Sequence, residues 1–176
     1  SDSQNITSET IEPAITEQTR AILCVHLAGW PCDMDPIMGL AKKHGLYVVE
    51  DCAQAHGALY NGKSVGAIGD IGCWSFCQDK IMTTGGEGGM VTTNNRDFWS
   101  KVWSCKDHGK SWEKVNEQQE HSSGFRWVHE SFGSNGRMTE IQAAIGRIQL
   151  KRIKQWHRTR SENANAILDY CARFSK

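Results

Sequence analysis

A strand-helix-strand pattern near the start of the chain most constrains its fold. An apolar run at 21–26 (AILCVH) and a second one at 47–50 (YVVE) flank a helix-like stretch. This stretch carries Pro36 in its first turn and is expected to end at Gly45. Strand, helix and strand within about 30 residues predict a β-α-β unit with a right-handed crossover. Its parallel sheet is expected to be buried on both faces.

The same periodicities predict the other elements. Two further apolar runs have strand length, at 71–76 and 89–93. Helical spacing appears at 96–108 and again from residue 139 onward. The remaining segments are expected to be a short helix or turn at 9–20 and a long exposed loop at 110–132. The pattern indicates an α/β fold, a mostly parallel sheet flanked by helices.

The helix from residue 139 is expected to be amphipathic. Its apolar face is predicted to consist of Ile141, Ala144, Ile145, Ile148 and Ile153.

The charge and hydropathy of the chain argue against nucleic acid and membranes as partners. Twenty basic and twenty acidic side chains cancel, so the chain offers no electrostatic reason to bind nucleic acid or an acidic membrane. A membrane-spanning helix needs about 20 apolar residues, and the aliphatic runs here are far shorter. A hydrophobic content of 39% is too high for a disordered segment. We therefore expect a folded chain without nucleic-acid or membrane partners.

The seven cysteines do not form a metal-binding pattern. No Cys-x-x-Cys pair occurs, and only Cys24-Val25-His26 approaches the close spacing that zinc sites use. No metal site is predicted. We interpret the cysteines as small buried hydrophobic residues in a reducing compartment, which favours the cytoplasm.

One segment matches a nucleotide-binding motif. Residues 57–64 (GALYNGKS) fit the phosphate-loop pattern G-x-x-x-x-G-K-[ST]. That motif requires a helix that opens at the lysine and serine, but three glycines follow within the next eight residues. A nucleotide-phosphate site is kept as an alternative, and a surface excursion between two strands is the preferred interpretation.

Polar residues follow the ends of the predicted strands, where open parallel sheets bind ligands. Asp51 ends one strand, Ser75 ends another, and Lys80 follows Ser75 by five residues. Taken singly, the two charged residues are interpreted as solvated or ion-paired. Together the three residues suit pyridoxal 5′-phosphate. Asp51 offers an ionised acid for the pyridine nitrogen, Ser75 offers a hydroxyl for the phosphate, and Lys80 offers an amine that condenses with the aldehyde.

Several ordered motifs make the chain resemble the DegT/DnrJ/EryC1/StrS family of sugar aminotransferases. They are Val25-His26-Leu27-Ala28-Gly29, the segment 50–58 (EDCAQAHGA), Gly69-Asp70-Ile71-Gly72, Trp74-Ser75-Phe76 with Lys80, the segment 86–91 (GEGGMV) and the segment 135–144 (NGRMTEIQAA). The resemblance implies the central part of the large domain of a type I aminotransferase that depends on pyridoxal phosphate.

The resemblance also implies roles for five residues. Lys80 matches the lysine that binds the cofactor covalently and moves the proton during transfer. Asp51 matches the acid that pairs with the pyridine nitrogen, and Gln54 the residue near the ring hydroxyl. Ser75 matches a contact of the cofactor phosphate. Asn135 matches an asparagine that reaches the phosphate bound to the neighbouring subunit, which implies a homodimer.

The reaction implied is transfer of an amino group from an amino acid such as glutamate to a nucleotide-linked keto-sugar, in amino-sugar or O-antigen (lipopolysaccharide) biosynthesis. The stretch 80–91 is most similar to the perosamine-synthase-like members. Related dehydrating members lack the lysine, so Lys80 favours aminotransfer. His56 and His108 lie near motif positions and are interpreted as structural histidines, and for Arg137 a structural ion pair and a functional role stand equal.

The chain departs from the family pattern in its extent. Residues 1–157 match part of the large domain, without its N-terminal phosphate-binding segment, and 158–176 match the start of the link to a small C-terminal domain. Gly136 also replaces an aromatic residue of the motif that contains Asn135. We therefore expect a fragment of a longer polypeptide. The alternative is a non-catalytic scaffold or degenerate family member.

Overall fold

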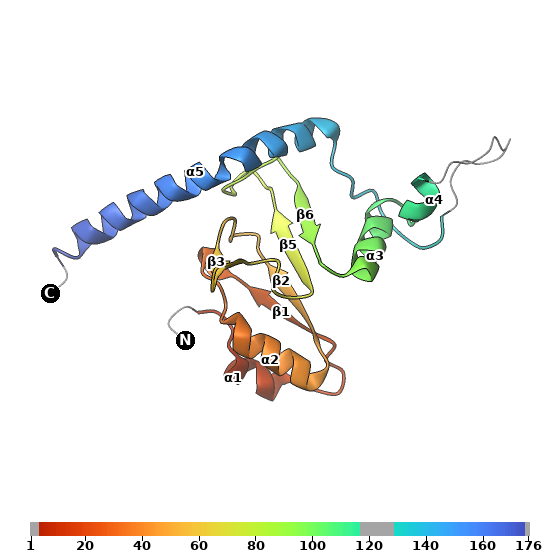
Figure 1. The fold of residues 1–176 in the computed structure, drawn as a ribbon, viewed down its shortest axis with the longest axis horizontal. Helices are drawn as coiled ribbons and strands as arrows, with labels where there is room; N and C mark the ends of the chain where they lie inside the picture. Colours follow the sequence, from red (N-terminus) through yellow and green to blue (C-terminus); the bar gives the residue numbers. More distant parts are fainter. Residues whose placement is uncertain (1–3, 117–128, 175–176) are drawn as a thin grey trace.

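The structure, a computed structural model, describes residues 4–116 and 129–174. Its centre is a four-stranded sheet in which three strands run parallel and the last runs antiparallel (Figure 1). In spatial order the strands are β1 (Ala21–Val25), β2 (Tyr47–Asp51), β5 (Ile71–Ser75) and β6 (Gly89–Thr92). The predicted α/β class and mostly parallel sheet are confirmed.

Helices occupy the predicted places along the chain. The short elements α1 (Ser8–Ile11) and η1 (Glu12–Ala14) fall where a short helix or turn was expected. The remaining helices are η2 (Leu27–Gly29), α2 (Met34–His44), α3 (Arg96–Lys106), α4 (Trp112–Asn116) and α5 (Glu140–Cys171). The helix α4 lies inside the stretch 110–132 that was expected to be a loop; part of this stretch, 117–128, lies outside the described residues.

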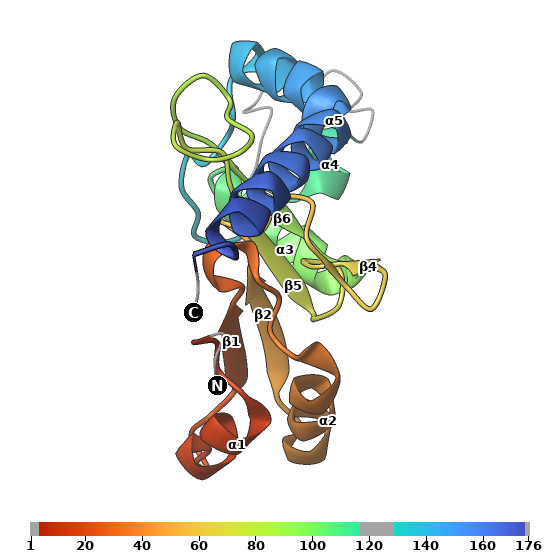
Figure 2. The same ribbon diagram turned by 90° about the vertical axis from the view of Figure 1, so that its left-hand side faces the viewer.

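The predicted β-α-β unit is formed by β1, α2 and β2. Pro36 lies in the first turn of α2, and Gly45 ends the helix in the left-handed conformation, with φ of 65°. The helix covers one face of the sheet (Figure 2). Because side chains alternate along a strand, every second residue of β1 and β2 meets this helix. The resulting core contains Ile22, Cys24, Cys32, Met34, Ile37, Ala41 and Val48.

The opposite face of the sheet is largely exposed, against the expectation that both faces are buried. Leu23 is 60% and Tyr47 53% exposed, and Phe98 of α3 meets Tyr47 edge to face, with ring centroids 5.2 Å apart. Among the described residues, α3 covers the β5 and β6 side of this face and reaches β2 at Tyr47 (Figure 1). A parallel sheet normally buries both faces, so this apolar surface lacks a cover here.

The phosphate-loop-like segment forms a hairpin. The strands β3 (Leu59–Tyr60) and β4 (Lys63–Ser64) pair antiparallel across Asn61-Gly62. Both turn residues have positive φ, 47° and 78°, as the commonest two-residue hairpin turn requires. Lys63 therefore lies in a strand, with no helix opening beside it. The segment is the surface excursion expected, and the alternative of a phosphate loop lacks its structural basis.

A buried hydrogen-bond network centred on Glu50 ties the β-α-β unit to the segment before β5. The fully buried side chains of His26 and Glu50 meet at 3.0 Å between Nε2 and Oε2. His26 Nδ1 accepts the backbone N–H of Cys32, so the ring carries its proton on Nε2 and donates it to Glu50. The same carboxylate accepts three backbone N–H groups, from Gly66, Ile68 and Gly69.

Burial by itself would raise the pKa of Glu50. The hydrogen bonds from His26 and from the three amides outweigh burial and hold the pKa below its ordinary value. Glu50 is therefore an ionised carboxylate whose four donors belong to two other segments of the chain, one after β1 and one before β5.

The helix α5 begins at a capping box formed by Thr139 and Gln142. The face that packs against the molecule differs from the predicted one: Ile141 and Ile148 are exposed, whereas Ile145, Gly146 and Gln149 contact the loop between β5 and β6. Gly146 is the reason, because a Cβ there would lie 2.9 Å from Thr84 Cγ2. The closest approach thus follows the glycine and not the isoleucines.

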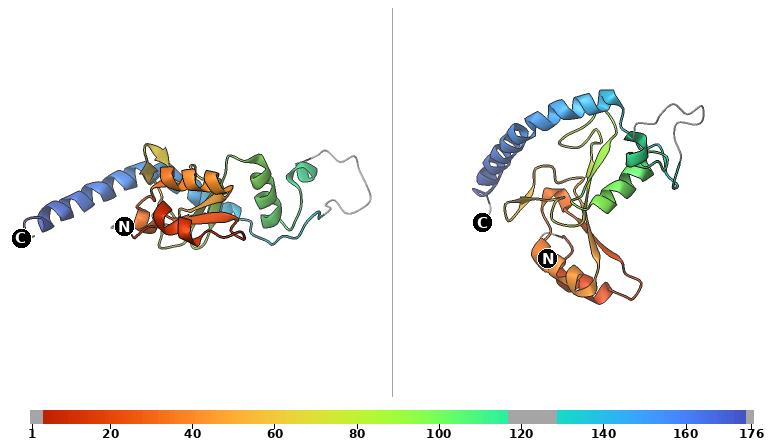
Figure 3. Two further views of the ribbon diagram at one scale, coloured as in Figure 1. Left: turned by 90° about the horizontal axis from the view of Figure 1, so that it is seen from below. Right: turned by 45° about the vertical axis from the view of Figure 1, so that its right-hand side comes forward.

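The C-terminal part of α5 extends beyond the rest of the molecule (Figure 3). In the described part of the chain, no helix has both the length and the apolar character needed to cross a membrane. The seven cysteines are unpaired, and the expectation that they are buried holds for only three of them. Cys24, Cys32 and Cys52 are buried, whereas Cys105 and Cys171 are exposed on helix surfaces.

We predict that Glu50→Gln destabilises the fold by about 3 kcal/mol, because it leaves buried donors without their charged acceptor. Since the native pKa of Glu50 is lowered, its contribution is present above the unfolded-state value near ~4.3 and is lost as the pH falls below it. Denaturant unfolding as a function of pH measures both effects, and the acid-dependent loss of stability should be smaller in the variant.

The control is Glu12→Gln, which removes an exposed ion pair with Lys43. Its unfolding midpoint should match that of the parent protein. Equal destabilisation by the two substitutions would contradict the role assigned to Glu50.

Candidate functional site

Asp51 and Ser75 lie on the same face of the sheet at its carboxyl edge. The strands β2 and β5 are parallel, and Asp51 pairs with Cys73, so Ser75 is two residues further along on the same side. Burial raises the pKa of the Cys73 thiol and the nearby charge of Asp51 raises it further, which places that carboxylate beside Cys73. Asp51 Oδ1 accepts the Ala53 N–H at 2.9 Å.

Lys80 lies in the loop that joins β5 to β6. Its backbone N–H donates to the Cys77 carbonyl, and its side chain, 21% exposed, is 3.3 Å from the Asp79 carboxylate. The loop is held at its base by paired Phe76 and Gly88 backbones. The amine therefore follows directly after the strand end that carries Ser75.

The helix α5 fixes this loop from above (Figure 1). Gln149 Oε1 accepts the Thr83 N–H at 2.9 Å, and the Gln142 amide donates to the Glu87 carbonyl at 2.7 Å. Gly88 is required inside the loop, since a Cβ there would lie 2.2 Å from Thr84 Oγ1. Contacts on both sides of Lys80 along the chain thus set the position of its backbone.

Gln54 follows Asp51 in the turn after β2. Its Oε1 accepts the Ala28 N–H at 2.7 Å, which leaves the amide NH₂ as the group that can donate to a ligand.

Asn5, a residue that sequence reasoning did not select, holds the same η2 segment: its Nδ2 donates to the Trp30 carbonyl and its Oδ1 accepts from Leu27. Only its near-complete burial marks Asn5 as structural.

Asn135 contacts residues at the end of α3 and in its own segment, and no described hydrogen bond joins it to the other four predicted residues. It forms an isolated β-bridge with Asp107 at the end of α3, and its Oδ1 accepts from Arg137 Nε at 3.1 Å. Arg137 also approaches Asp107, with 3.5 Å between Nη1 and Oδ1. Arg137 thus has the ion-pair role considered for it, and through Asn135 it also contacts a predicted site residue. His108 is part of the same region and contacts His129, with ring centroids 6.4 Å apart.

His56 departs from the interpretation of a satisfied structural histidine. It is 4% exposed and lies against Trp74 and Phe76, yet neither ring nitrogen has a hydrogen-bond partner. Burial lowers the pKa of His56, and the positive charge of Lys80 lowers this pKa further. The Ser75 carbonyl, which is nearby but outside hydrogen-bond geometry, raises it. A neutral imidazole is thus close enough to Lys80 to sense its charge.

The buried groups His26, Glu50 and Cys52 place one potential ligand atom each within 4.8 Å of one another. Both nitrogens of His26 and both carboxylate oxygens of Glu50 are already engaged in hydrogen bonds. This arrangement satisfies every polar atom without a metal, so the cluster is explained as a structural network.

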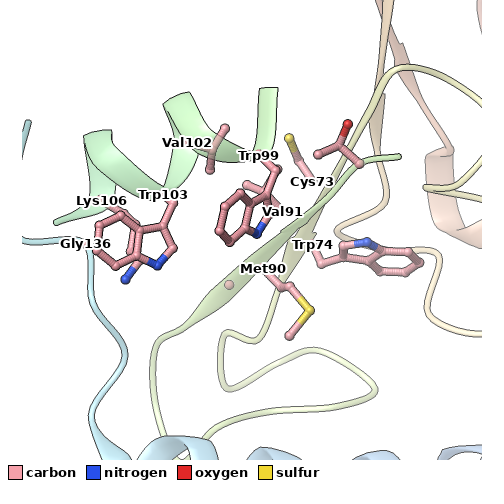
Figure 4. Close-up of a pocket in the computed structure, with 11 residues that line it drawn as sticks. Cys73, Trp74, Met90, Val91, Trp99, Val102, Trp103, Lys106 and Gly136 are labelled. Carbon is pink, nitrogen blue, oxygen red and sulfur yellow. The ribbon is translucent and has the colours of Figure 1, made fainter. Parts of the chain in front are cut away.

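An apolar hollow of about 460 Å³ adjoins this edge of the sheet. Figure 4 shows Cys73 and Val91 directed toward α3, where Trp99 and Trp103 form the opposite wall. Trp74 and Met90 project to the other side of the strands. The hollow borders the Cys73 neighbour of Asp51 but contains none of the five predicted site residues.

Four of the predicted residues therefore belong to the carboxyl edge of β2 and β5: Asp51 and Ser75 end the strands, and Gln54 and Lys80 lie in the segments that follow them. Asp51 offers a carboxylate, Ser75 a hydroxyl and Lys80 a primary amine. This is the donor set that a pyridine nitrogen, a phosphate and an aldehyde require. Within the described residues Asp51 Oδ2 makes no hydrogen bond, so the acid retains an acceptor for a ligand. The residues present fit pyridoxal phosphate.

This α/β fold is that of aminotransferases that use pyridoxal phosphate. Residues 1–173 match the model of the DegT/DnrJ/EryC1/StrS aminotransferase family. The chain belongs to that family.

Two solved structures and one curated relative illustrate the match. The aminotransferase from Psychrobacter cryohalolentis is 64% identical with a TM-score of 0.93, over 98% of this chain and 43% of that one. DesV of S. venezuelae, determined with a ketimine intermediate, is 38% identical with a TM-score of 0.81, over 94% and 41%. GDP-perosamine synthase of Escherichia coli O157:H7 is 44% identical over 88% of this chain and 39% of its own length. The chain thus spans about two fifths of these relatives.

We predict that Asp51→Asn accelerates alkylation of Cys73 severalfold at a fixed, mildly alkaline pH. The substitution removes a charge that raises the pKa of this thiol, so more thiolate forms. Iodoacetamide labelling followed by peptide mass spectrometry resolves the individual cysteines. Cys171, exposed near the end of α5, provides the control and should react at an unchanged rate. An unchanged rate at Cys73 would place the Asp51 carboxylate elsewhere.

Proposed function

We propose that this chain is the cofactor-binding core of a longer enzyme that transfers an amino group from an amino acid to a nucleotide-linked keto-sugar. The observation that carries the proposal is the place of Lys80 in the loop after β5, because β5 ends in Ser75 and pairs with β2, the strand that ends in Asp51. Relatives named as sugar transaminases support the substrate class. Glutamate is proposed as the amino donor, and amino-sugar or O-antigen biosynthesis as the setting.

The extent of the chain supports its description as part of a larger protein, since it spans about two fifths of its relatives. We propose that residues 1–157 belong to the large domain and that 158–176 lead toward a second domain. The boundary falls inside α5, which continues without a break from Glu140 to Cys171. We also propose that the protein acts in the cytoplasm, where its unpaired thiols stay reduced.

Pyridoxal phosphate, when bound, supplies an electron-withdrawing ring that stabilises negative charge on the carbon that exchanges its amino group. Asp51 would hold a proton on the ring nitrogen, because an ionised acid next to that nitrogen favours its charged form. Ser75 would donate its hydroxyl hydrogen to the phosphate. Gln54 would donate its amide N–H to the ring oxygen, since its Oε1 is already occupied by Ala28.

Lys80 would attach the cofactor through its Nζ and then, once released, carry the proton between the two carbons involved in transfer. Its amine needs to be neutral to attack an aldehyde.

The test is cofactor attachment in the complete protein that contains this chain. Lys80→Ala should abolish the covalent cofactor adduct that borohydride reduction traps, and transamination should fall by several orders of magnitude. The adduct mass, located by peptide mass spectrometry, should lie on the Lys80 peptide of the parent protein.

Lys63→Ala is the matched control because Lys63 lies in the hairpin β3–β4. It should leave attachment and turnover unchanged, and no saturable ATP binding should depend on it. A folded Lys80→Ala protein that keeps full activity would favour the non-catalytic alternative for this lysine, and ATP binding lost in Lys63→Ala would restore the phosphate-loop alternative.

We further propose a homodimer in which Asn135 of each subunit reaches the cofactor phosphate of the other. Asn135 makes its described contacts with Asp107 and Arg137 and none with the residues at the strand ends, which supports this proposal. Mixing two inactive variants, Lys80→Ala and Asn135→Ala, should then restore activity, because one site of each mixed dimer receives both intact residues. With random exchange the recovery approaches about one quarter of the parent activity.

The double variant Lys80→Ala/Asn135→Ala, mixed with either single variant, is the control and should restore nothing. Failure of the two single variants to complement each other, although subunit exchange is shown to occur, would place Asn135 in its own subunit's site.

A further inference from the structure

A second hollow, of about 220 Å³, lies on the α5 side of the turn that follows β2. It is separate from the one that adjoins α3. Figure 1 shows α5 crossing above this part of the molecule. The wall on the sheet side includes Gly29, His56 and Ile81, and the wall on the α5 side includes His157, Arg160 and Ser161.

The sheet-side wall contains a buried polar group that lacks a partner. His56 is 4% exposed, and both of its ring nitrogens are without a hydrogen bond. A buried polar group without a partner costs free energy, so a ligand that supplies one is stabilising. Burial lowers the pKa of His56, so the ring is neutral and offers one N–H donor.

The α5 wall brings a cation to the same hollow. The ring of His157 lies against Gly57, where a Cβ would be only 3.0 Å from its Cδ2. In the part of the chain that the structure describes, Arg160 makes no ion pair, whereas Arg158 pairs with Glu162 at 2.7 Å. The charge of Arg158 is thus compensated by Glu162 on the helix surface, whereas the charge of Arg160, which lines the hollow, is not.

The polar side chains of the lining are hydrogen-bond donors set among small apolar residues. It includes an imidazole N–H, a guanidinium, a serine hydroxyl and the amide of Gln54, and the described lining contains no Asp or Glu. Donors of this kind around one cation match an oxyanion, and the guanidinium geometry suits carboxylate and phosphate equally. A volume of about 220 Å³ admits such a group together with several waters.

We propose that this hollow binds a small oxyanion, a carboxylate or a phosphate group, held between Arg160 and the buried His56. Apart from Gln54, which the proposed function assigns to the cofactor, the residues of this site have no role in the proposed aminotransfer, and the site needs no bound cofactor. It can therefore be tested whether or not the proposed reaction is correct.

The probes are inorganic phosphate and acetate, added to the protein at constant pH and ionic strength. Each probe that binds should raise the midpoint of thermal unfolding in a saturable manner, because it binds the folded state. In NMR spectra, the imidazole signals of His56 and His157 should shift with the same saturation curve. His44, at the end of α2, provides an internal control and should not shift.

Arg160→Gln is the decisive variant, and Arg158→Gln is its matched control on the same helix. Loss of the guanidinium at 160 should weaken binding of the oxyanion about tenfold, whereas the control should stay within about twofold of the parent. His56→Phe, which keeps an aromatic ring between Trp74 and Phe76, should also weaken binding. Tighter binding of phosphate or of acetate identifies the source of the oxyanion.

Saturable shifts confined to His56 and His157, lost in Arg160→Gln alone, would establish the site. Equal weakening by both arginine variants, or shifts that also include His44, would reduce the effect to general ionic attraction and overturn the proposal. The absence of any saturable shift with either probe would overturn it as well.

Discussion

The carboxylate of Glu50 is the interaction on which the rest of the structure depends. It is fully buried at the penultimate residue of β2 and accepts hydrogen bonds from His26, after β1, and from backbone amides before β5. Three segments distant in sequence therefore meet at one charge. Because Asp51 follows Glu50 directly, the same contacts that anchor the strand end also fix where the proposed catalytic acid emerges. A buried charge with this many donors specifies one arrangement, since any shift leaves a donor unpaired.

Much of the fold was predictable because local pattern and tertiary packing agree. Apolar runs of strand length and the terminating Gly45 correctly indicated the β-α-β unit. The dipeptide Asn61-Gly62 is typical of a two-residue hairpin turn, and it lies inside the segment that also matches the phosphate-loop pattern. The exposed side of the sheet was not predictable. The apolar residues of β1 and β2 indicate that both faces of these strands favour burial, but they do not indicate whether a packing segment lies on each face. The packed face of α5 likewise followed Gly146, whose role appears only when Thr84 is brought opposite it.

The candidate site divides in the same way. Strand ends converge by geometry in any parallel sheet, so Asp51 and Ser75 could be placed together from sequence alone. The states of side chains could not, since they depend on what surrounds them. His56 was taken for a satisfied histidine, yet its nitrogens are without partners. The position of Asn135 beside Asp107 likewise depends on a tertiary contact that no spacing in the sequence indicates.

The length of α5 has a mechanical consequence. The helix contacts the lysine-bearing loop through Gly146 and Gln149 and the turn after β2 through His157, and it continues without a break to Cys171. At 1.5 Å per residue, the contacts at Gly146 and His157 lie about 16 Å apart along the helix. A displacement of α5 at one of these contacts is therefore passed on to the other, so the loop that carries Lys80 and the turn that carries Gln54 are mechanically linked.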